Sequence, residues 1–463
     1  MRLRFAPSPT GYLHVGGLRT ALYNFFLAKQ SKGKLILRIE DTDQNRLVQN
    51  AEENLINMLG WAGIDFDEGP HVSGGYGPYR QSERLTIYKE YYLKLIQIGH
   101  AYPCFYSKQR LQDLESGKLS SEDATIEDSV FQDFDLSNIL QKMETESFVV
   151  RLKIPNNDFI NFNDLIKGNI KFDLNLINDP IIIKSDGFPT YHFANVIDDH
   201  LMKITHVIRG EEWLPSIPKH IVLYQSLGWS PPEFGHLPLL LNSDKSKLSK
   251  RKNDVSVESY IKKGYTKESL INFLSLLGWH EKGDREFYNL NELIEAFSLD
   301  RVNKSGAIFD VQKLNAFNNH YIKNYKFDKL KHLLSPFIFE DWIITKDIID
   351  LVKDKAFTLC DFKNLLSFIF IDSISHSDEN IKILKSKVGS NILQSFLMNI
   401  KTINSLKEMS QLVQQDTDCS PKEFWSIIRI ALSGESHGPA LDMIINIYGL
   451  DKVKSRINDA LKL

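Results

Sequence analysis

Near its N-terminus the chain carries the stretch Phe5-Ala6-Pro7-Ser8-Pro9-Thr10-Gly11-Tyr12-Leu13-His14-Val15-Gly16-Gly17. Its two prolines fix φ and end a strand. Its glycines, Gly11, Gly16 and Gly17, allow close approach of the backbone to a ligand, or a positive φ. A helix that begins near Leu18 directs its free N–H groups and its dipole at this turn. The stretch therefore predicts a strand–turn–helix unit with an anion site at the turn.

The residues on either side extend this unit. Leu3 to Phe5 is apolar and predicts a first strand, and the residues after the turn predict an amphipathic helix, because Leu18, Ala21, Leu22, Phe25 and Phe26 recur at helical spacing. The segment from Lys34 to Ile39 is apolar enough for a parallel strand buried on both faces. A strand, a helix and a second strand form a βαβ unit. This order predicts a nucleotide-binding α/β fold, in which ligands bind at the carboxyl ends of the strands.

The pattern changes twice further along the chain. A second α/β segment spans about residues 181–241, with expected strands at 180–184 and 203–210 followed by a helix that carries Ile221, Leu223 and Leu227. Residues 100–178 between the two segments are more polar and irregular, and they predict an insertion that splits one α/β domain. From about Ser256 onward the apolar spacing is helical.

The second informative stretch is Lys247-Leu248-Ser249-Lys250-Arg251, which follows an expected strand near residues 238–242. A random basic run of this length is usually a solvated loop. Its position on the ligand edge of the second α/β segment favours a different interpretation, since lysines there can reach phosphate groups. His14 also has a structural and a functional interpretation. A lone histidine in a turn is more often a structural cap, but beside a helix N-terminus it can donate a hydrogen bond to a phosphate.

Composition limits the class of protein. The chain of 463 residues has 25% charged and 42% hydrophobic residues and a formal net charge of −3, and this length is enough for about three domains. The N-terminus lacks the apolar core of a signal peptide, and no apolar run approaches the roughly 18 residues that a membrane-spanning helix needs. We therefore expect a cytoplasmic protein with no membrane association. The three cysteines (Cys104, Cys360 and Cys419) are too widely separated to indicate a disulfide framework.

Taken together, these stretches resemble the class I aminoacyl-tRNA synthetases, with His14-Val15-Gly16-Gly17 as the HIGH-type motif and residues 247–251 as the KMSKS-type motif. Within that class the chain is similar to the bacterial glutamyl-tRNA synthetases. This similarity extends to about residue 320, and beyond that point it is one of architecture. Five stretches carry it: Ala6 to Gly17, Arg38 to Asp43, Gly77 to Arg84, Thr190 to His200 and Arg301 to Ala307.

The resemblance implies a Rossmann-type catalytic domain split by an α/β insertion, followed by a helical stem-contact region and an all-helical anticodon-binding domain. The expected divisions are 1–98 for the first half of the catalytic domain, 99–180 for an acceptor-stem-binding insertion, 181–255 for the second half with the KMSKS-type loop, 256–320 for the stem-contact region and 321–463 for the anticodon-binding domain.

The resemblance also implies a two-step reaction, in which L-glutamate and ATP form glutamyl-adenylate and the acyl group then passes to the 3′-terminal adenosine of tRNA(Glu). The residues implied for catalysis are His14, Lys247 and Lys250. Those implied for glutamate binding are Arg4, Ala6, Ser8, Glu40, Tyr191, Asn195 and Arg209. Those implied for ATP binding are Ser8, Thr10, His14, Gly16, Gly17, Glu212, Leu248, Ser249 and Lys250. Mg²⁺ accompanies ATP, although no protein ligand for it can be identified from the sequence.

The chain departs from the pattern of this family at a zinc site. Many members carry such a site in the insertion, and it begins with a Cys-x-Cys pair. Here the corresponding residues are Cys104-Phe105-Tyr106, and no histidine occurs between His100 and His192. Because a tetrahedral site needs four ligands, we predict no zinc and no other structural metal.

Several alternatives remain open from the sequence. The chain could be a non-discriminating form that also glutamylates tRNA(Gln), or a catalytically silent paralogue that binds tRNA. A shorter paralogue that glutamylates queuosine in tRNA lacks residues corresponding to those after about 320, and glutaminyl-tRNA synthetases have a β-barrel C-terminal half where this chain is helical. Intact His14, Glu40, Arg209 and Lys250 favour an active enzyme. We expect a monomer.

Overall fold

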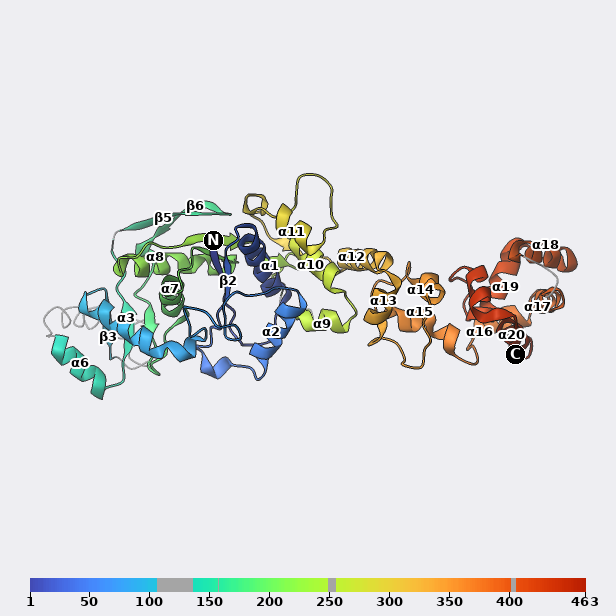
Figure 1. The fold of residues 1–463 in the computed structure, drawn as a ribbon, viewed down its shortest axis with the longest axis horizontal. Coiled ribbons are helices and arrows are strands. Elements are labelled where there is room, and N and C mark those ends of the chain that lie inside the picture. Colours follow the sequence, from blue (N-terminus) through green and yellow to red (C-terminus); the bar gives the residue numbers. More distant parts are fainter. Residues whose placement is uncertain (106–135, 157, 249–254, 401–404) are drawn as a thin grey trace. The chain divides into compact units, whose positions relative to one another are not determined.

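The computed structural model describes residues 1–105, 136–156, 158–248, 255–400 and 405–463 (Figure 1). These residues form two compact units. Unit 1 consists of Met1–Tyr260 and Leu270–Asp310, and unit 2 consists of Ile261–Ser269 and Val311–Leu463. Within the described ranges, no helix is both long enough and apolar enough to cross a membrane.

A four-stranded parallel sheet forms the centre of unit 1. Its order is β2-β1-β8-β9. The strands are β1 (Arg2–Phe5), β2 (Lys34–Leu37), β8 (His206–Gly210) and β9 (Glu233–Leu237). Leu3 pairs with both Leu35 and His206, so the two halves of the catalytic domain share one sheet. The α/β fold predicted from the first forty residues is confirmed.

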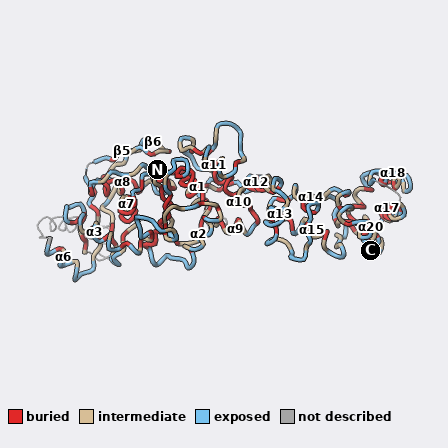
Figure 2. The backbone as a smooth tube through the Cα atoms, viewed as in Figure 1, coloured by how far each residue is buried: buried red, intermediate tan, exposed pale blue. Residues whose placement is uncertain are grey.

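Helix α1 (Val15–Gln30) connects β1 to β2 and packs on both strands. It begins three residues before the expected start at Leu18, because His14 caps its first turn. The apolar spacing seen in the sequence is its buried face, which Figure 2 shows as part of the interior. The N-terminus of α1 therefore lies at the carboxyl end of β1.

The segment between the two halves of the sheet contains its own strands. Strands β3 (Ala101–Cys104), β4 (Val149–Leu152) and β7 (Ile181–Ile183) form an antiparallel sheet in that order. We expected residues 180–184 to belong to the second α/β half, but β7 pairs with β4 instead. A short apolar run indicates a buried strand and does not identify its partner, which explains the difference.

A hairpin of β5 (Phe159–Asp164) and β6 (Gly168–Asp173) follows β4 and lies against β9. The backbone N–H of Leu165, in the hairpin turn, donates to the carbonyl of Phe234 on β9 at 2.8 Å. The hairpin therefore covers one edge of the parallel sheet, which would otherwise expose unpaired backbone groups. It also places residues of the insertion directly beside the edge strand β9.

Helices complete unit 1, and one of its apolar cores lies between the parallel sheet, the insertion sheet, α3, α7 and α8. The remaining elements of this unit, some shared with unit 2, are α2 (Ala51–Trp61), α3 (Leu85–Gln97), α6 (Leu136–Thr145), α7 (Tyr191–Leu201), α8 (Ile217–Ser226), β10 (Leu240–Leu241), α9 (Val257–Lys262), α10 (Lys267–Leu276), α11 (Leu290–Ala296) and β11 (Ala307–Ile308).

Unit 2 is helical throughout its described residues, as the spacing predicted. Its core is a single apolar cluster that extends from Ile322 to Ala460. The helix α19 begins at Pro421 with a capping box between Ser420 and Glu423. The helices are α12 (Val311–Asn324), α13 (Phe327–Leu334), α14 (Lys346–Val352), α15 (Asp361–Phe370), α16 (Asp378–Lys385), α17 (Lys387–Asn399), α18 (Leu406–Thr417), α19 (Pro421–Ser433) and α20 (Leu441–Leu461).

Candidate active site

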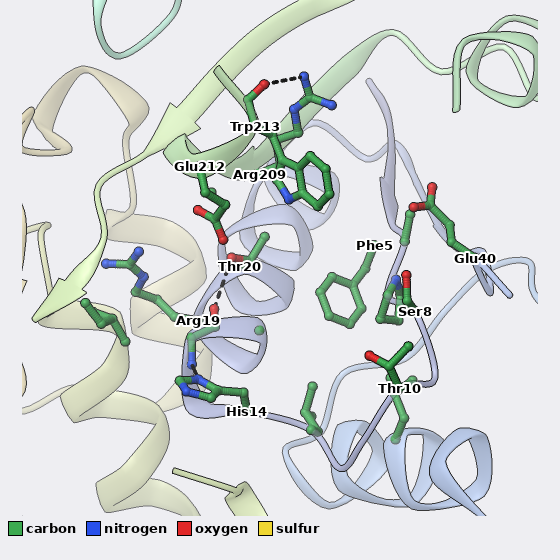
Figure 3. Close-up of a pocket in the computed structure, with 18 of the residues that line it drawn as sticks. Phe5, Ser8, Thr10, His14, Arg19, Thr20, Glu40, Arg209, Glu212 and Trp213 are labelled. Carbon is green, nitrogen blue, oxygen red and sulfur yellow. Dashed lines mark hydrogen bonds between the residues drawn. The ribbon is translucent and has the colours of Figure 1, made fainter. Parts of the chain in front are cut away.

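A cavity of about 480 Å³ opens at the carboxyl ends of β1 and β8 (Figure 3). In Figure 3, Glu40 and Ser8 lie on one side of this cavity, and His14 lies at the opposite end from Arg209 and Trp213. The structure brings together most of the residues named from the sequence: Arg4, Ala6, Ser8, Thr10, His14, Gly16, Gly17, Glu40, Tyr191, Asn195, Arg209, Glu212, Lys247 and Leu248. The other two, Ser249 and Lys250, fall outside the residues that the structure describes.

The Pro/Gly-rich turn folds back onto the chain that follows β2. The carbonyl of Pro7 accepts the backbone N–H of Glu40 at 3.0 Å, and the carbonyl of Pro9 accepts that of Val48 at 3.1 Å. Gly11 has a φ of 154°, a value that other residues rarely adopt. This turn therefore holds the backbone of Glu40 beside Ser8 at the carboxyl end of the sheet.

His14 is the N-cap of α1. Its Nδ1 accepts the backbone N–H of Gly16 at 2.9 Å, so a neutral imidazole carries its proton on Nε2. A Cβ at Gly16 would lie 3.2 Å from that Nδ1, so a side chain there would press against the ring of His14. Neither Gly16 nor Gly17 has a positive φ. The cap uses only Nδ1, so it is compatible with a role of Nε2 in binding a ligand.

Both ends of the basic loop are anchored at the cavity. On one side, the backbone N–H of Leu248 donates to Leu240 at 2.9 Å. On the other side, Val255 accepts the N–H of Val15, and Val257 donates to Leu13, both at 2.9 Å. The second anchor is the backbone on either side of His14. The described residues that flank 249–254 therefore lie beside Leu240 at one end and beside the first turn of α1 at the other.

Arg4 and Arg38 share one buried carboxylate beneath the cavity. Asp199 accepts Arg4 Nε at 3.1 Å and Arg38 Nη1 at 2.7 Å. Burial acts to raise the pKa of Asp199, but the two guanidinium groups outweigh it and hold that pKa below its usual value. Within the described part of the chain, the two terminal nitrogens of Arg4 make no hydrogen bond, and Arg4 lines the cavity. Asp199 thus fixes the position of the Arg4 guanidinium group at the cavity wall.

Glu40 is held by the same cluster. Its Oε1 accepts Arg38 Nη2 at 3.0 Å and Asn195 Nδ2 at 3.1 Å. Burial raises the pKa of this carboxyl, while Arg38 and Arg4 act in the opposite direction. Glu40 supplies a negative charge at the cavity wall, suited to an ammonium group.

Arg209 projects from the end of β8 at the end of the cavity opposite His14. Its Nη1 donates to the Tyr191 hydroxyl at 2.8 Å, and its Nη2 donates to the carbonyl of Trp213 at 3.3 Å. The rings of Tyr191 and Trp213 lie against each other with centroids 4.1 Å apart. This arrangement gives a second cationic group, rigidly held, on the cavity wall.

Known proteins match this chain along its whole length. Residues 1–316 match the family model described as tRNA synthetases class I (E and Q), catalytic domain, and residues 319–461 match that of an anticodon binding domain. A glutamate–tRNA ligase of Alkaliphilus metalliredigens is 43% identical, over 99% of this chain and 98% of that protein. A crystal structure of a glutamate tRNA ligase from Elizabethkingia meningosepticum, in complex with its amino acid, has a TM-score of 0.90 and 34% identity, over 100% of this chain and 99% of that one.

The chain belongs to the glutamate–tRNA ligase family. A second relative, from Chlorobium phaeobacteroides, is 41% identical over 100% of this chain and 98% of its own length. The resemblance stated from the motifs is therefore confirmed, as are the class I catalytic fold, the helical anticodon-binding region and the assignment as an aminoacyl-tRNA synthetase.

The charges beneath the cavity of this glutamate–tRNA ligase family member were not predicted from the sequence. No role was expected for Arg38, Asp198 or Asp199. Asp198 lies behind Asp199 and accepts Arg84 Nε at 2.6 Å, Gln81 at 2.8 Å and the Tyr88 hydroxyl at 2.8 Å. The available signal was charge within apolar surroundings: Arg38 directly follows the apolar strand β2, and the two aspartates lie near the C-terminal end of the buried helix α7.

Two further residues of the cavity wall were also missed. Arg19, on α1, is buried and donates to the carbonyls of Leu277 and Pro238. Gly210 precedes the acidic pair in the sequence, and a Cβ there would lie 2.1 Å from Glu212 Oε2. A side chain at position 210 would therefore displace the Glu212 carboxylate from the place that it occupies here.

The zinc prediction for this family member concerns residues that the structure describes only in part. Cys104 is buried at the end of β3, and Tyr106 falls outside the described residues. The described part of the chain contains no group of three or more His, Cys, Asp or Glu residues placed to hold a metal ion. The absence of zinc stays a prediction.

Proposed function

We propose that this protein activates L-glutamate with ATP and transfers the glutamyl group to the 3′-terminal adenosine of tRNA(Glu). One observation carries the proposal. A single cavity holds two oriented guanidinium groups and a carboxylate at one end and, at the other, a helix N-terminus flanked by both ends of a basic loop. The first set suits an amino acid with two carboxylates, and the second suits a triphosphate.

In this proposal the glutamate is held by charge at both of its ends. Arg4 and Arg209 bind its carboxylates, and Glu40 binds its ammonium group. The fixed positions of these groups support the assignment, because Asp199 and Arg38 hold two of them through buried hydrogen bonds. The remaining side chains of the glutamate pocket are Ala6, Ser8, Tyr191 and Asn195.

The ATP is bound across the first turn of α1 with Mg²⁺ as its counter-ion. A carboxylate oxygen of glutamate attacks the α-phosphorus, the bond to the bridging oxygen breaks, and pyrophosphate leaves. His14, Lys247 and Lys250 stabilise the charge that grows on the phosphates. The other ATP-binding residues are Ser8, Thr10, Gly16, Gly17, Glu212, Leu248 and Ser249.

In this proposal the tRNA contacts the remaining regions of the chain. Its acceptor stem contacts the insertion at 99–180 and the region at 256–320, and its anticodon contacts the helical domain at 321–463. The second family-model match, an anticodon binding domain, supports the last of these. Because its substrates belong to protein synthesis, the enzyme works in the cytoplasm, and we propose that it does so as a monomer and without zinc.

Aminoacylation of purified tRNA(Glu) and tRNA(Gln) tests this function directly. We expect glutamylation of tRNA(Glu), and charging of both would identify a non-discriminating enzyme. No charging of either tRNA would contradict the proposal and favour a silent tRNA-binding paralogue. Glutamate- and ATP-dependent pyrophosphate exchange, run with and without tRNA, separates the first step from the second.

The basic loop is tested by Lys250→Ala. Loss of one oriented contact to a developing charge costs about 3–4 kcal/mol, so pyrophosphate exchange falls on the order of a hundredfold or more while glutamate binding changes little. Lys252→Ala in the same loop is the matched control and leaves exchange near the wild-type rate. Near-wild-type exchange in Lys250→Ala would contradict the role of Lys250.

A further inference from the structure

A buried histidine–aspartate pair lies directly behind Arg209. His236 on β9 is 0% exposed, and Asp164 at the end of β5 is 1% exposed. His236 Nδ1 and Asp164 Oδ2 are 2.6 Å apart, and His236 Nε2 accepts Arg209 Nε at 3.1 Å. Arg209 lines the cavity, whereas Asp164 and His236 do not. The pair therefore acts on the cavity only through Arg209.

The fold fixes which oxygen of Asp164 faces the histidine. Its Oδ1 accepts three backbone N–H groups, from Ile166 at 3.0 Å, from Lys167 at 2.8 Å and from His236 at 3.2 Å. Two of these donors belong to the hairpin turn and the third to β9. With Oδ1 committed in this way, Oδ2 is the oxygen that accepts from the imidazole.

The same contacts determine the tautomer of His236. Nδ1–H donates to Asp164, so the lone pair of Nε2 is available to accept Arg209 Nε–H. A proton on Nε2 would place two donors against each other. Burial lowers the pKa of His236, and the nearby Arg209 charge adds to the effect, so the neutral ring is favoured. Asp164, Arg209 and Arg4 are the charged groups that act on this ring.

Arg209 is held on three sides when these contacts are combined. His236 takes Nε, Tyr191 takes Nη1 and the carbonyl of Trp213 takes Nη2. The three contacts engage three different nitrogens of one planar group, so together they fix its plane and its position. Without the contact to Nε, two contacts at the terminal nitrogens remain, and the guanidinium can tilt about them away from a bound carboxylate.

We propose that Asp164 and His236 are positioning residues for Arg209, and that the insertion hairpin β5–β6 thereby sets the affinity of the site for glutamate. The proposal rests on the assignment of Arg209 to the glutamate pocket. It assigns to the insertion a function in amino-acid recognition in addition to contact with tRNA.

Asp164→Asn is the decisive variant. The Asn oxygen can still accept the backbone N–H groups, and its amide then donates to His236 Nδ1. The ring proton moves to Nε2, where it opposes Arg209 Nε–H. We expect the KM for glutamate to rise on the order of tenfold to a hundredfold, the range for an unsatisfied buried donor, with the KM for ATP within about twofold. Asp158→Asn, at an exposed position directly before β5, is the matched control and keeps wild-type values.

Two variants of His236 separate positioning from packing. His236→Gln keeps one donor and one acceptor at similar spacing and should retain a KM for glutamate near that of the wild type. His236→Leu removes both and should raise it. If Asp164→Asn does not fold, this pair decides, and equal values for the two folded His236 variants would overturn the proposal. Histidine ¹⁵N NMR of the full chain should show the His236 proton on Nδ1 in the wild type and on Nε2 in Asp164→Asn.

Arg209→Lys distinguishes failure of this inference from failure of the proposed function. If Arg209→Lys leaves the KM for glutamate unchanged, the assignment of Arg209 to the glutamate pocket is wrong, and the inference is overturned with it. If Arg209→Lys raises that KM while folded Asp164→Asn and His236→Leu do not, the glutamate pocket stands and the positioning role is wrong.

Discussion

The two units of this protein bury different kinds of side chain. Unit 1 buries Arg4, Arg38, Arg84 and Arg209 together with Glu40, Asp164, Asp198 and Asp199 around one cavity. The core of unit 2 is an apolar cluster, and Arg456 is the buried charged side chain among its described residues. A buried ion pair is no more stabilising than well-packed apolar side chains. In the proposed function, the ion pairs of unit 1 fix the charges that bind glutamate.

The buried arginine of unit 2 supports this distinction. Arg456 donates to the carbonyls of Phe368 and Ile371 at the C-terminal end of α15, and its guanidinium lies near the ring of Tyr448. A cation at this end of a helix stabilises its free carbonyls. Arg456 thus has a structural role, whereas Arg4 has a carboxylate partner on one side and the cavity on the other.

Asp199→Ala should have the largest effect of the substitutions that test this comparison, because it affects both stability and glutamate binding. It leaves Arg4 and Arg38 without their shared buried carboxylate, and breaking a buried pair costs about 3–5 kcal/mol of the free energy of unfolding. Glutamate binding should be lost as well, because Arg4 is no longer oriented. Chemical denaturation and calorimetric titration with glutamate measure the two effects.

The matched control for this change is Asp65→Ala, an exposed carboxylate in the same unit, which should alter stability by no more than about 0.5 kcal/mol. A folded Asp199→Ala protein with wild-type glutamate affinity would show that the buried charges of unit 1 are structural only.

Phe362→Ala should destabilise unit 2 without touching the glutamate site. Phe362 is fully buried in the apolar cluster, and such a truncation costs about 3–5 kcal/mol. We expect aminoacylation to fall at moderate temperature while calorimetric glutamate affinity is unchanged. Ile343→Ala, at a position 78% exposed in the same unit, serves as the control. Weaker glutamate binding in Phe362→Ala would contradict the division of roles between the units.

The smallest expected effect is a pH dependence that arises from Glu40. Burial raises its pKa above the ordinary value of 4.5, so on acidification it becomes neutral at a higher pH than an exposed carboxyl does. The neutral form cannot hold an ammonium group, so kcat/KM for glutamate falls about tenfold per pH unit below that pKa.

Profiles of kcat/KM against pH for the wild type and Glu40→Gln measure this effect. The Gln variant should have a lower and flatter profile over the range where Glu40 titrates. A wild-type profile that stays flat down to pH values near the ordinary pKa would contradict the assignment of the ammonium contact to Glu40.

The sequence predicted those parts of the fold that depend on neighbouring residues. The first strand, helix α1 and strand β2 follow from local apolar spacing. The strand at 181–183 was predicted, but its membership of the antiparallel sheet was not. Strand pairing is a contact between distant segments and leaves no mark in the local pattern.

The site divides in the same way. By itself the sequence determined the βαβ unit, the helical character of the C-terminal half, and, through its motifs, the family and half of the residues that line the cavity. Only the tertiary structure decided that Asp199 contacts both Arg4 and Arg38, although Asp199 and Arg38 are 161 positions apart in the chain. It also decided that His236 contacts Arg209 and that Asp164 contacts His236. The physical reason is that apolar periodicity is a local property, whereas a buried charge is tolerated only when the fold brings a distant partner to it.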